Sequence, residues 1–127
     1  MGFTHVTVAV SNPADTEKRW ESLFLVDTGA IDCLVPAKQL KAVGIEPKGE
    51  RVYELADGSQ ITLKVGGAQI EFMGDVVWAT VIFGDDDAEP ILGVTALESV
   101  GIEVDPRNQR LKRLPAVRLK TIKSGNK

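Results

Sequence analysis

Leu23-Phe24-Leu25-Val26-Asp27-Thr28-Gly29-Ala30 is the stretch of this sequence that says most about the fold. Its four leading apolar residues predict a buried strand, and Asp27 stands where that strand ends. Gly29 allows close backbone approach in the turn that follows. A second group, Ile91-Leu92-Gly93, begins 64 residues after Asp27 and leads into a short predicted helix. The stretch therefore predicts a strand end that presents one carboxylate.

The two motifs, in this order and spacing, resemble the lobe of a retropepsin-like aspartic protease. The resemblance covers residues 20–103 and implies a mostly β fold, a closed retropepsin-like barrel lobe with one or two short helices. Retroviral members carry an Asp–Arg ion pair where this chain has Ile31 and Val94. Replacing both partners of an ion pair by apolar residues is often neutral or stabilising. The paired change therefore favours a different branch of the family, such as the small cellular aspartic proteases of microbes, over a retroviral enzyme that has lost its function.

Composition indicates one ordinary globular domain. The chain has 127 residues, of which 43% are hydrophobic, and a net charge of −3. This length predicts a single domain over residues 1–119 with a flexible tail over 120–127. The acidic balance argues against a nucleic-acid partner. Neither a membrane-spanning segment nor an N-terminal signal is visible, and the lone Cys33 suits a reducing compartment, so we expect a cytoplasmic protein.

Hydrophobic periodicity and turn residues predict the order of elements. Asp57-Gly58 is the strongest hairpin signal, and Gly66-Gly67 is interpreted as a turn. Gly44 and Gly101 are predicted to end the two helices. The predicted elements are strand 3–10, turn 11–15, strand 20–26, helix 37–43, hairpin 51–65, strands 68–73 and 75–83, loop 84–90, helix 95–100 and a closing hairpin over 102–114.

One heptapeptide occurs twice. Residues 40–46 read LKAVGIE and residues 97–103 read LESVGIE, an offset of 57 with five of seven positions identical. Convergence on one good helix end would explain the echo. Duplication of a strand–loop–helix half, matching residues 24–46 to 91–103, would explain it equally well. Such an internal twofold is consistent with the resemblance.

Hydrolysis of a peptide bond by aspartates requires two carboxylates at one water molecule. Two such groups a few Å apart share one proton, as is general for aspartic proteases. This chain offers one carboxylate in a suitable setting, and Asp32 is expected to point elsewhere. The resemblance therefore implies a homodimer in which each copy contributes Asp27.

Further roles follow from the resemblance. Thr28 and Gly29 would support the active site and contact the partner, and Gly29 would meet the substrate backbone. The hairpin around Asp57-Gly58 would form a flap that closes over an extended peptide. Residues 110–119 are a candidate for the strand at the dimer interface. The predicted substrate-binding residues of the flap and subsites are Ala30, Ile31, Asp32, Leu55, Ala56, Asp57, Gly58, Ser59 and Ile91.

Other chemistry fits the residues less well. A Cys33 nucleophile would need a histidine, and the only one, His5, lies in an early strand. One His and one Cys are too few for zinc, and residues 85–89 lack the alternation of a calcium loop. We therefore expect no metal and no cofactor. The alternative to an aspartic-type endopeptidase acting on peptides or unfolded proteins is a non-catalytic dimerisation or peptide-binding module, against which the intact Asp-Thr-Gly counts.

Overall fold

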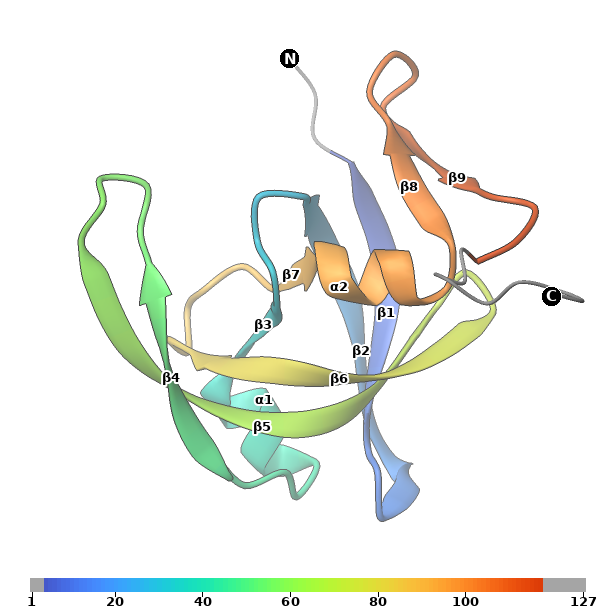
Figure 1. Ribbon diagram of the computed structural model, residues 1–127. Helices are drawn as coiled ribbons and strands as arrows, with labels where there is room; N and C mark the ends of the chain where they lie inside the picture. Colours follow the sequence, from blue (N-terminus) through green and yellow to red (C-terminus); the bar gives the residue numbers. More distant parts are fainter. Residues whose placement is uncertain (1–3, 118–127) are drawn as a thin grey trace, which may run out of the picture.

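The computed structural model describes residues 4–117, which form β-strands and two short helices (Figure 1). This confirms the mostly β class. The predicted tail at 120–127 lies outside the described residues. The strands are β1 His5–Asn12, β2 Asp15–Asp27, β3 Cys33–Pro36, β4 Gly49–Glu54, β5 Gln60–Phe72, β6 Asp75–Gly84, β7 Ile91–Gly93, β8 Ile102–Asp105 and β9 Arg110–Arg113, and the helices are α1 Ala37–Ala42 and α2 Val94–Ser99.

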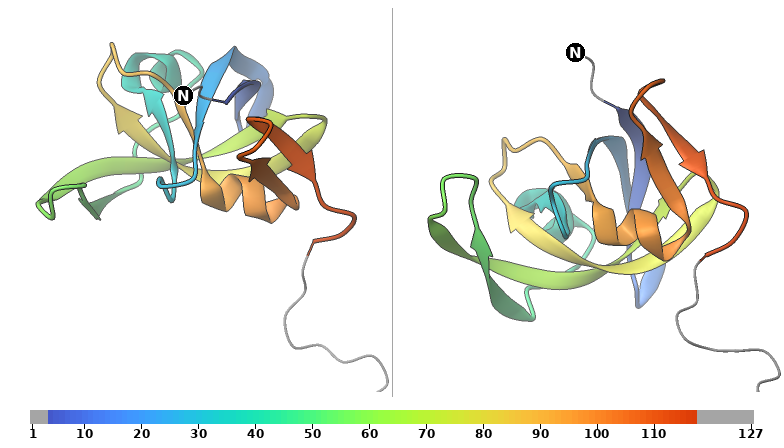
Figure 2. Two further views of the ribbon diagram at one scale, coloured as in Figure 1. Left: turned by 90° about the horizontal axis from the view of Figure 1, so that it is seen from above. Right: turned by 45° about the horizontal axis from the view of Figure 1, so that its top comes forward.

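The main sheet has seven strands in the order β1-β2-β7-β3-β6-β5-β4. It curves back on itself because β1 pairs with β5 as well as with β2. β4 lies outside this ring and pairs only with β5, so the β4–β5 hairpin projects from one side of the molecule (Figures 1 and 2). The β8–β9 hairpin forms a separate two-stranded sheet on the other side.

Alternate residues of the ring strands fill its interior. Val8 and Val10 of β1, for example, are almost completely buried. Both helices add one leucine each to this core, Leu40 and Leu97. Burying such side chains stabilises each by about 1.5–3 kcal/mol relative to exposure. The largest fully buried side chains are Phe24, Phe72, Leu40, Ile70, Leu92, Leu97 and Ile102.

Most predicted elements are present, with boundaries shifted by a few residues. Both helices, the closing hairpin and the strand expected over 75–83 are confirmed. The predicted turn over 11–15 is too long, because only residues 13–14 form the turn. β2 begins at Asp15, five residues before the predicted strand. Its first part is exposed and polar, so it lacks an apolar pattern and is defined by its pairing with β1.

The predicted turn at Gly66-Gly67 is wrong, because β5 runs unbroken through both glycines. The same strand pairs with β4 before Gly66 and with β6 from Val65 onward. A Cβ atom at Gly66 would lie 3.0 Å from the carbonyl oxygen of Glu46 and 3.1 Å from the ring of Phe83. Glycine at position 66 therefore permits close packing within a strand.

The repeated heptapeptide marks a local twofold arrangement. α1 and α2 start and end at positions that differ by 57. Their ends are alike: Gly44 and Gly101 have φ values of 82° and 71°, as expected for glycine after a helix. Leu34 and Ile91, which also differ by 57, are partners in the antiparallel contact between β3 and β7. Pairing between equivalent residues is what a twofold axis produces.

The same offset relates the flanking parallel pairs. Leu25 of β2 pairs with Ile91 of β7, and the equivalent residues, Ile82 of β6 and Leu34 of β3, also pair. The correspondence therefore extends from the helices back into β2 and β6. Residues 24–46 match residues 81–103, ten residues earlier than the predicted start at Ile91. The duplicated arrangement is thus supported by strand register as well as by sequence.

Candidate active site

Asp27 is the last residue of β2 and is half-buried. It lies beside Gly93, its parallel partner at the end of β7. Phe24, three residues earlier, is fully buried in the core and anchors the strand. The apolar run predicted from the sequence therefore places one carboxylate at the end of a firmly held strand.

The backbone after Asp27 folds around its carboxylate. The N–H of Gly29 donates to Oδ1 of Asp27 over 2.9 Å, and the N–H of Ala30 donates to the Asp27 carbonyl over 3.0 Å. A Cβ atom at Gly29 would lie 3.2 Å from the same Oδ1 atom. Glycine thus brings the backbone close enough to hold the carboxylate in one orientation.

The loop is also tied to α2. The N–H groups of Val94 and Thr95 donate to the carbonyls of Ala30 and Ile31 over 2.8 Å and 3.2 Å. These donors belong to the first turn of the helix, where N–H groups have no partner within the helix. A Cβ atom at Gly93 would lie 2.6 Å from the carbonyl oxygen of Asp32, so the two segments are in direct backbone contact.

A cavity of about 610 Å³ lies between this loop and the β4–β5 hairpin. Most of its lining is apolar, and several of the apolar side chains are exposed, including Ile31 at 61% and Val52 at 58%. Its charged residues are Asp32, Arg51 and Glu54. The full lining is Gly29, Ala30, Ile31, Asp32, Leu34, Arg51, Val52, Tyr53, Glu54, Leu55, Ala56, Ile61, Leu63 and Ile82.

Asp32 is a buried carboxylate with two donors from β4. Its Oδ2 atom accepts from Nη1 of Arg51 over 2.9 Å and from the hydroxyl of Tyr53 over 2.7 Å. Burial, followed by the hydrogen bond to Asp32, raises the pKa of Tyr53 to about 12. Tyr53 therefore remains a neutral hydroxyl donor throughout the physiological pH range.

The structure brings together only part of the predicted site. Six predicted residues line the cavity, namely Gly29, Ala30, Ile31, Asp32, Leu55 and Ala56, whereas Asp27 and Thr28 are not part of its lining. Asp57, Gly58 and Ser59 lie in the exposed loop of the hairpin, where Asp57 accepts from the backbone and hydroxyl of Ser59. Ile91 is the first residue of β7 and pairs with Leu25 of β2 and Leu34 of β3. Thr28 is exposed next to Asp27.

Sequence reasoning missed several lining residues, most notably Arg51 and Tyr53. Both side chains reach the same carboxylate from alternate positions of β4, which is the periodicity of one strand face. The alternation of Arg51 and Tyr53 is visible in the sequence, but nothing in the sequence indicates that both side chains bind Asp32. Other lining residues absent from the prediction are Leu34, Val52, Glu54, Ile61, Leu63 and Ile82.

Cys33 lies beneath the site as a neutral thiol. It is 1% exposed, and its sulfur accepts from the N–H of Gly93 over 3.5 Å. Burial raises the pKa of Cys33 to about 11, although the hydrogen bond from Gly93 acts to lower it. A buried, protonated thiol is a poor nucleophile, so Cys33 is not a candidate catalytic residue.

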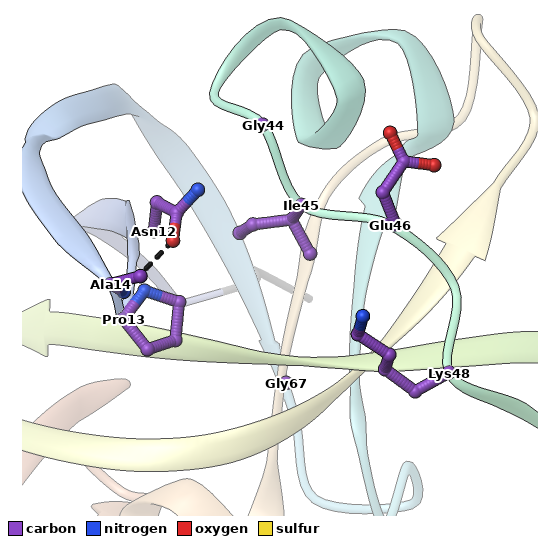
Figure 3. A pocket seen from close by; sticks show the side chains of 8 residues that line it. All are labelled: Asn12, Pro13, Ala14, Gly44, Ile45, Glu46, Lys48 and Gly67. Atoms are coloured by element: carbon purple, nitrogen blue, oxygen red, sulfur yellow. Dashed lines mark hydrogen bonds between the residues drawn. The ribbon is translucent and has the colours of Figure 1, made fainter.

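A second depression, of about 440 Å³, lies at the other end of β2 (Figure 3). The side chain of Asn12 accepts from the N–H of Ala14 and donates to the carbonyl of Val43. Both ends of this amide thus join the β1–β2 turn to the end of α1. The depression contains Glu46 and Lys48 but no side chain from the Asp27 loop, so we place the candidate site at the larger cavity.

Comparison with known proteins adds no family assignment: no family model and no curated protein matches the chain. Within residues 4–117, no helix has the length and apolar character needed to cross a membrane. The same residues contain no group of three or more His, Cys, Asp or Glu side chains placed to hold a metal ion. The geometry around Asp27 is therefore the main support for a function.

Proposed function

We propose that this protein is an aspartic-type endopeptidase with a retropepsin-like barrel fold that acts as a homodimer. The observation that carries the proposal is the setting of Asp27. Its carboxylate stands at a strand end and accepts the N–H of Gly29 over 2.9 Å, and the loop residues Gly29–Asp32 that follow it line a cavity beside the β4–β5 hairpin. The ring-like sheet and the internal twofold are consistent with the resemblance stated above.

The proposed chemistry uses two Asp27 carboxylates that share one proton. The ionised carboxylate takes a proton from a water molecule while the protonated one donates to the oxygen of the scissile carbonyl. The water oxygen attacks the carbonyl carbon to form a tetrahedral intermediate. The carboxyl group that took the proton from water then gives it to the nitrogen, the C–N bond breaks to release the amine, and the other carboxylate recovers a proton from the hydroxyl of the intermediate. Sharing of a proton predicts highest activity at mildly acidic pH.

The second carboxylate would come from a partner copy. Position 84, the internal equivalent of Asp27, is a glycine, and Asp32 is already bound by Arg51 and Tyr53. Neither position supplies a second free carboxylate within one chain. Thr28 and Gly29 are exposed beside Asp27, which fits a contact between two such loops across a twofold axis.

The cavity would bind an extended peptide. The hairpin β4–β5 would cover the peptide backbone and exclude water from the reacting groups. Exposed apolar side chains on both walls favour apolar substrate side chains over charged ones. In the described residues these side chains are Ile31, Val52, Leu55 and Ile61.

The test is cleavage of unfolded casein and of a fluorogenic peptide by the purified protein. Asp27→Asn should reduce activity by at least about 1,000-fold, because the variant cannot form the dyad. Asp15→Asn is the matched control, since Asp15 is an exposed aspartate at the other end of β2. A statine-type inhibitor should block the wild type and the control equally.

The non-catalytic alternative has its own outcome. If wild type and Asp27→Asn are equally inactive but bind the same peptides with equal affinity, the domain is a binding module. If Asp27→Asn cleaves as fast as wild type, any activity present does not come from Asp27 and the proposal is wrong.

A further inference from the structure

The β4–β5 hairpin is held to the candidate site by a single carboxylate. β4 is the last strand of the sheet and pairs only with β5. Within residues 4–117, the side-chain hydrogen bonds and ion pairs of β4 all end on Asp32. These bonds cross the cavity, since Asp32 belongs to the loop after Asp27.

The two ends of this contact differ in how firmly they are fixed. The neighbouring carbonyls of Ala30 and Ile31 accept N–H groups of α2, and Asp32 itself is packed against Gly93. The hairpin beyond Tyr53 is exposed, and a Cβ atom at Gly58 would meet no atom within 4 Å. Asp32 therefore connects a fixed loop to an exposed hairpin.

The burial of Asp32 gives this contact its strength. Its side chain is 8% exposed, whereas the side chain of Arg51 is 51% exposed. Opening the hairpin would leave a largely buried carboxylate without donors, which is unfavourable unless water enters. The hydrogen bond from Tyr53 to Asp32 is shorter than the one from Arg51, at 2.7 Å against 2.9 Å. Because the side chain of Arg51 is half-exposed, solvent screens its ion pair with Asp32.

We propose that Asp32 is a positioning residue that holds the β4–β5 hairpin closed over the cavity, and that the Tyr53 hydroxyl releases it when the hairpin opens. Opening would be needed to admit a peptide and to release products. The link to peptide entry rests on the proposed function, but the closing contact does not. Asp32 would act through the hairpin and take no part in the proton transfers at Asp27.

Hydrogen exchange on the protein without substrate tests the contact directly. Tyr53→Phe removes one hydroxyl and should speed amide exchange in residues 49–63 about tenfold, as expected for losing a hydrogen bond to a charged group. Exchange in β1 and β6 should change less than twofold. Thr62→Val is the matched control, because it removes an exposed hydroxyl from the same hairpin, and should leave exchange unchanged.

Asp32→Asn should also speed exchange in the hairpin, because a neutral amide is a weaker acceptor for both donors. In that background Tyr53→Phe should add less than about threefold, since both substitutions weaken the same contact. Two outcomes would overturn the proposal: less than twofold faster exchange in Tyr53→Phe, or equally faster exchange throughout residues 4–117.

Inhibitor kinetics separate this proposal from the proposed function. With a statine-type inhibitor, Tyr53→Phe should raise both the association rate and the dissociation rate, because each requires the hairpin to open. An association rate that stays at the wild-type value or falls would contradict a positioning role. If wild type binds no inhibitor and cleaves nothing, the proposed function fails, while the exchange result still decides whether the closing contact exists.

Discussion

The two halves of the molecule, residues 24–46 and 81–103, have the same framework and different chemistry. Each half has two strands followed by a helix of six residues, and each of these strands pairs in parallel with a strand of the other half. At the strand end, the first half has Asp27 and the second half has Gly84. A Cβ atom at Gly84 would lie 2.5 Å from the side chain of Leu34. The second position is therefore closed to a side chain unless Leu34 moves.

Each helix begins against the loop of the other half. In α2, the N–H of Thr95 donates to the carbonyl of Ile31. In α1, the N–H of the equivalent residue, Lys38, donates to the carboxylate of Asp86 over 3.0 Å. Both loops thus accept N–H groups from the start of the opposite helix, and the loop of the first half also holds the carboxylate of Asp27. The framework is repeated, but the candidate catalytic group occurs once per chain.

The largest expected effect concerns the contact between the halves at Gly93. Gly93→Ala would place a Cβ atom 2.6 Å from the carbonyl oxygen of Asp32, where backbone must move. We expect a loss of about 3 kcal/mol in the free energy of unfolding, measured by urea denaturation. Gly67→Ala is the control, since a Cβ atom there meets nothing within 4 Å. Equal stability of the two variants would refute the close contact.

Cys33 provides a pH-dependent comparison, because the equivalent position in the second half, Pro90, cannot ionise. The pKa of Cys33 is about 11 in the folded protein against 9.0 for an unburied thiol. Above pH 9 the unfolded chain loses this proton first, so stability should fall as pH rises toward 11, by about 2 kcal/mol. Below pH 9 this contribution is constant.

Urea unfolding between pH 7.5 and 10.5 measures this effect. Cys33→Ala should show a smaller decline in stability above pH 9 than wild type, whatever its constant offset. Parallel curves for the two proteins would mean that the thiol ionises as readily in the folded state as in the unfolded state.

Gly44 and Gly101 test whether the two helix ends are equivalent. Both have positive φ, so alanine at either position should cost about 1–2 kcal/mol. Gly44→Ala should be the more destabilising of the two. Its Cβ atom would lie 2.9 Å from the side chain of Asn12, whereas the Cβ atom of Gly101→Ala would lie 3.2 Å from the side chain of Val117. Thermal unfolding of both variants measures the costs. If alanine lowers stability at only one of the two positions, the two helix ends are not equivalent.

Local signals in the sequence predicted much of the framework. Apolar runs and turn residues identified the strand before Asp27, both helices and the two hairpins on either side of the ring. The start of β2 was missed because Asp15–Arg19 is exposed and polar and depends on pairing with β1. The glycine pair in β5 was misinterpreted because glycine serves equally for turns and for close packing.

The candidate site was less predictable than the framework. The carboxylate and its loop came from a contiguous motif, Asp27-Thr28-Gly29. The closing contact joins Asp32 to residues 19 and 21 positions away. No local pattern states which strand face will meet which loop, since tertiary packing decides it. For the same reason the sequence predicted all of residues 55–59 as substrate-binding, whereas only Leu55 and Ala56 of these line the cavity, together with residues of both strands.

The central claim is that one chain supplies half of a catalytic site. Titrating Asp27→Asn into a fixed concentration of wild type tests it most directly, after time for subunits to exchange. Mixed dimers would contain one Asp27, so activity per wild-type chain should fall in proportion to the wild-type fraction, to about one tenth at a ninefold excess. Asp15→Asn in the same excess should not lower it. Activity per wild-type chain that stays constant against Asp27→Asn would contradict the shared site.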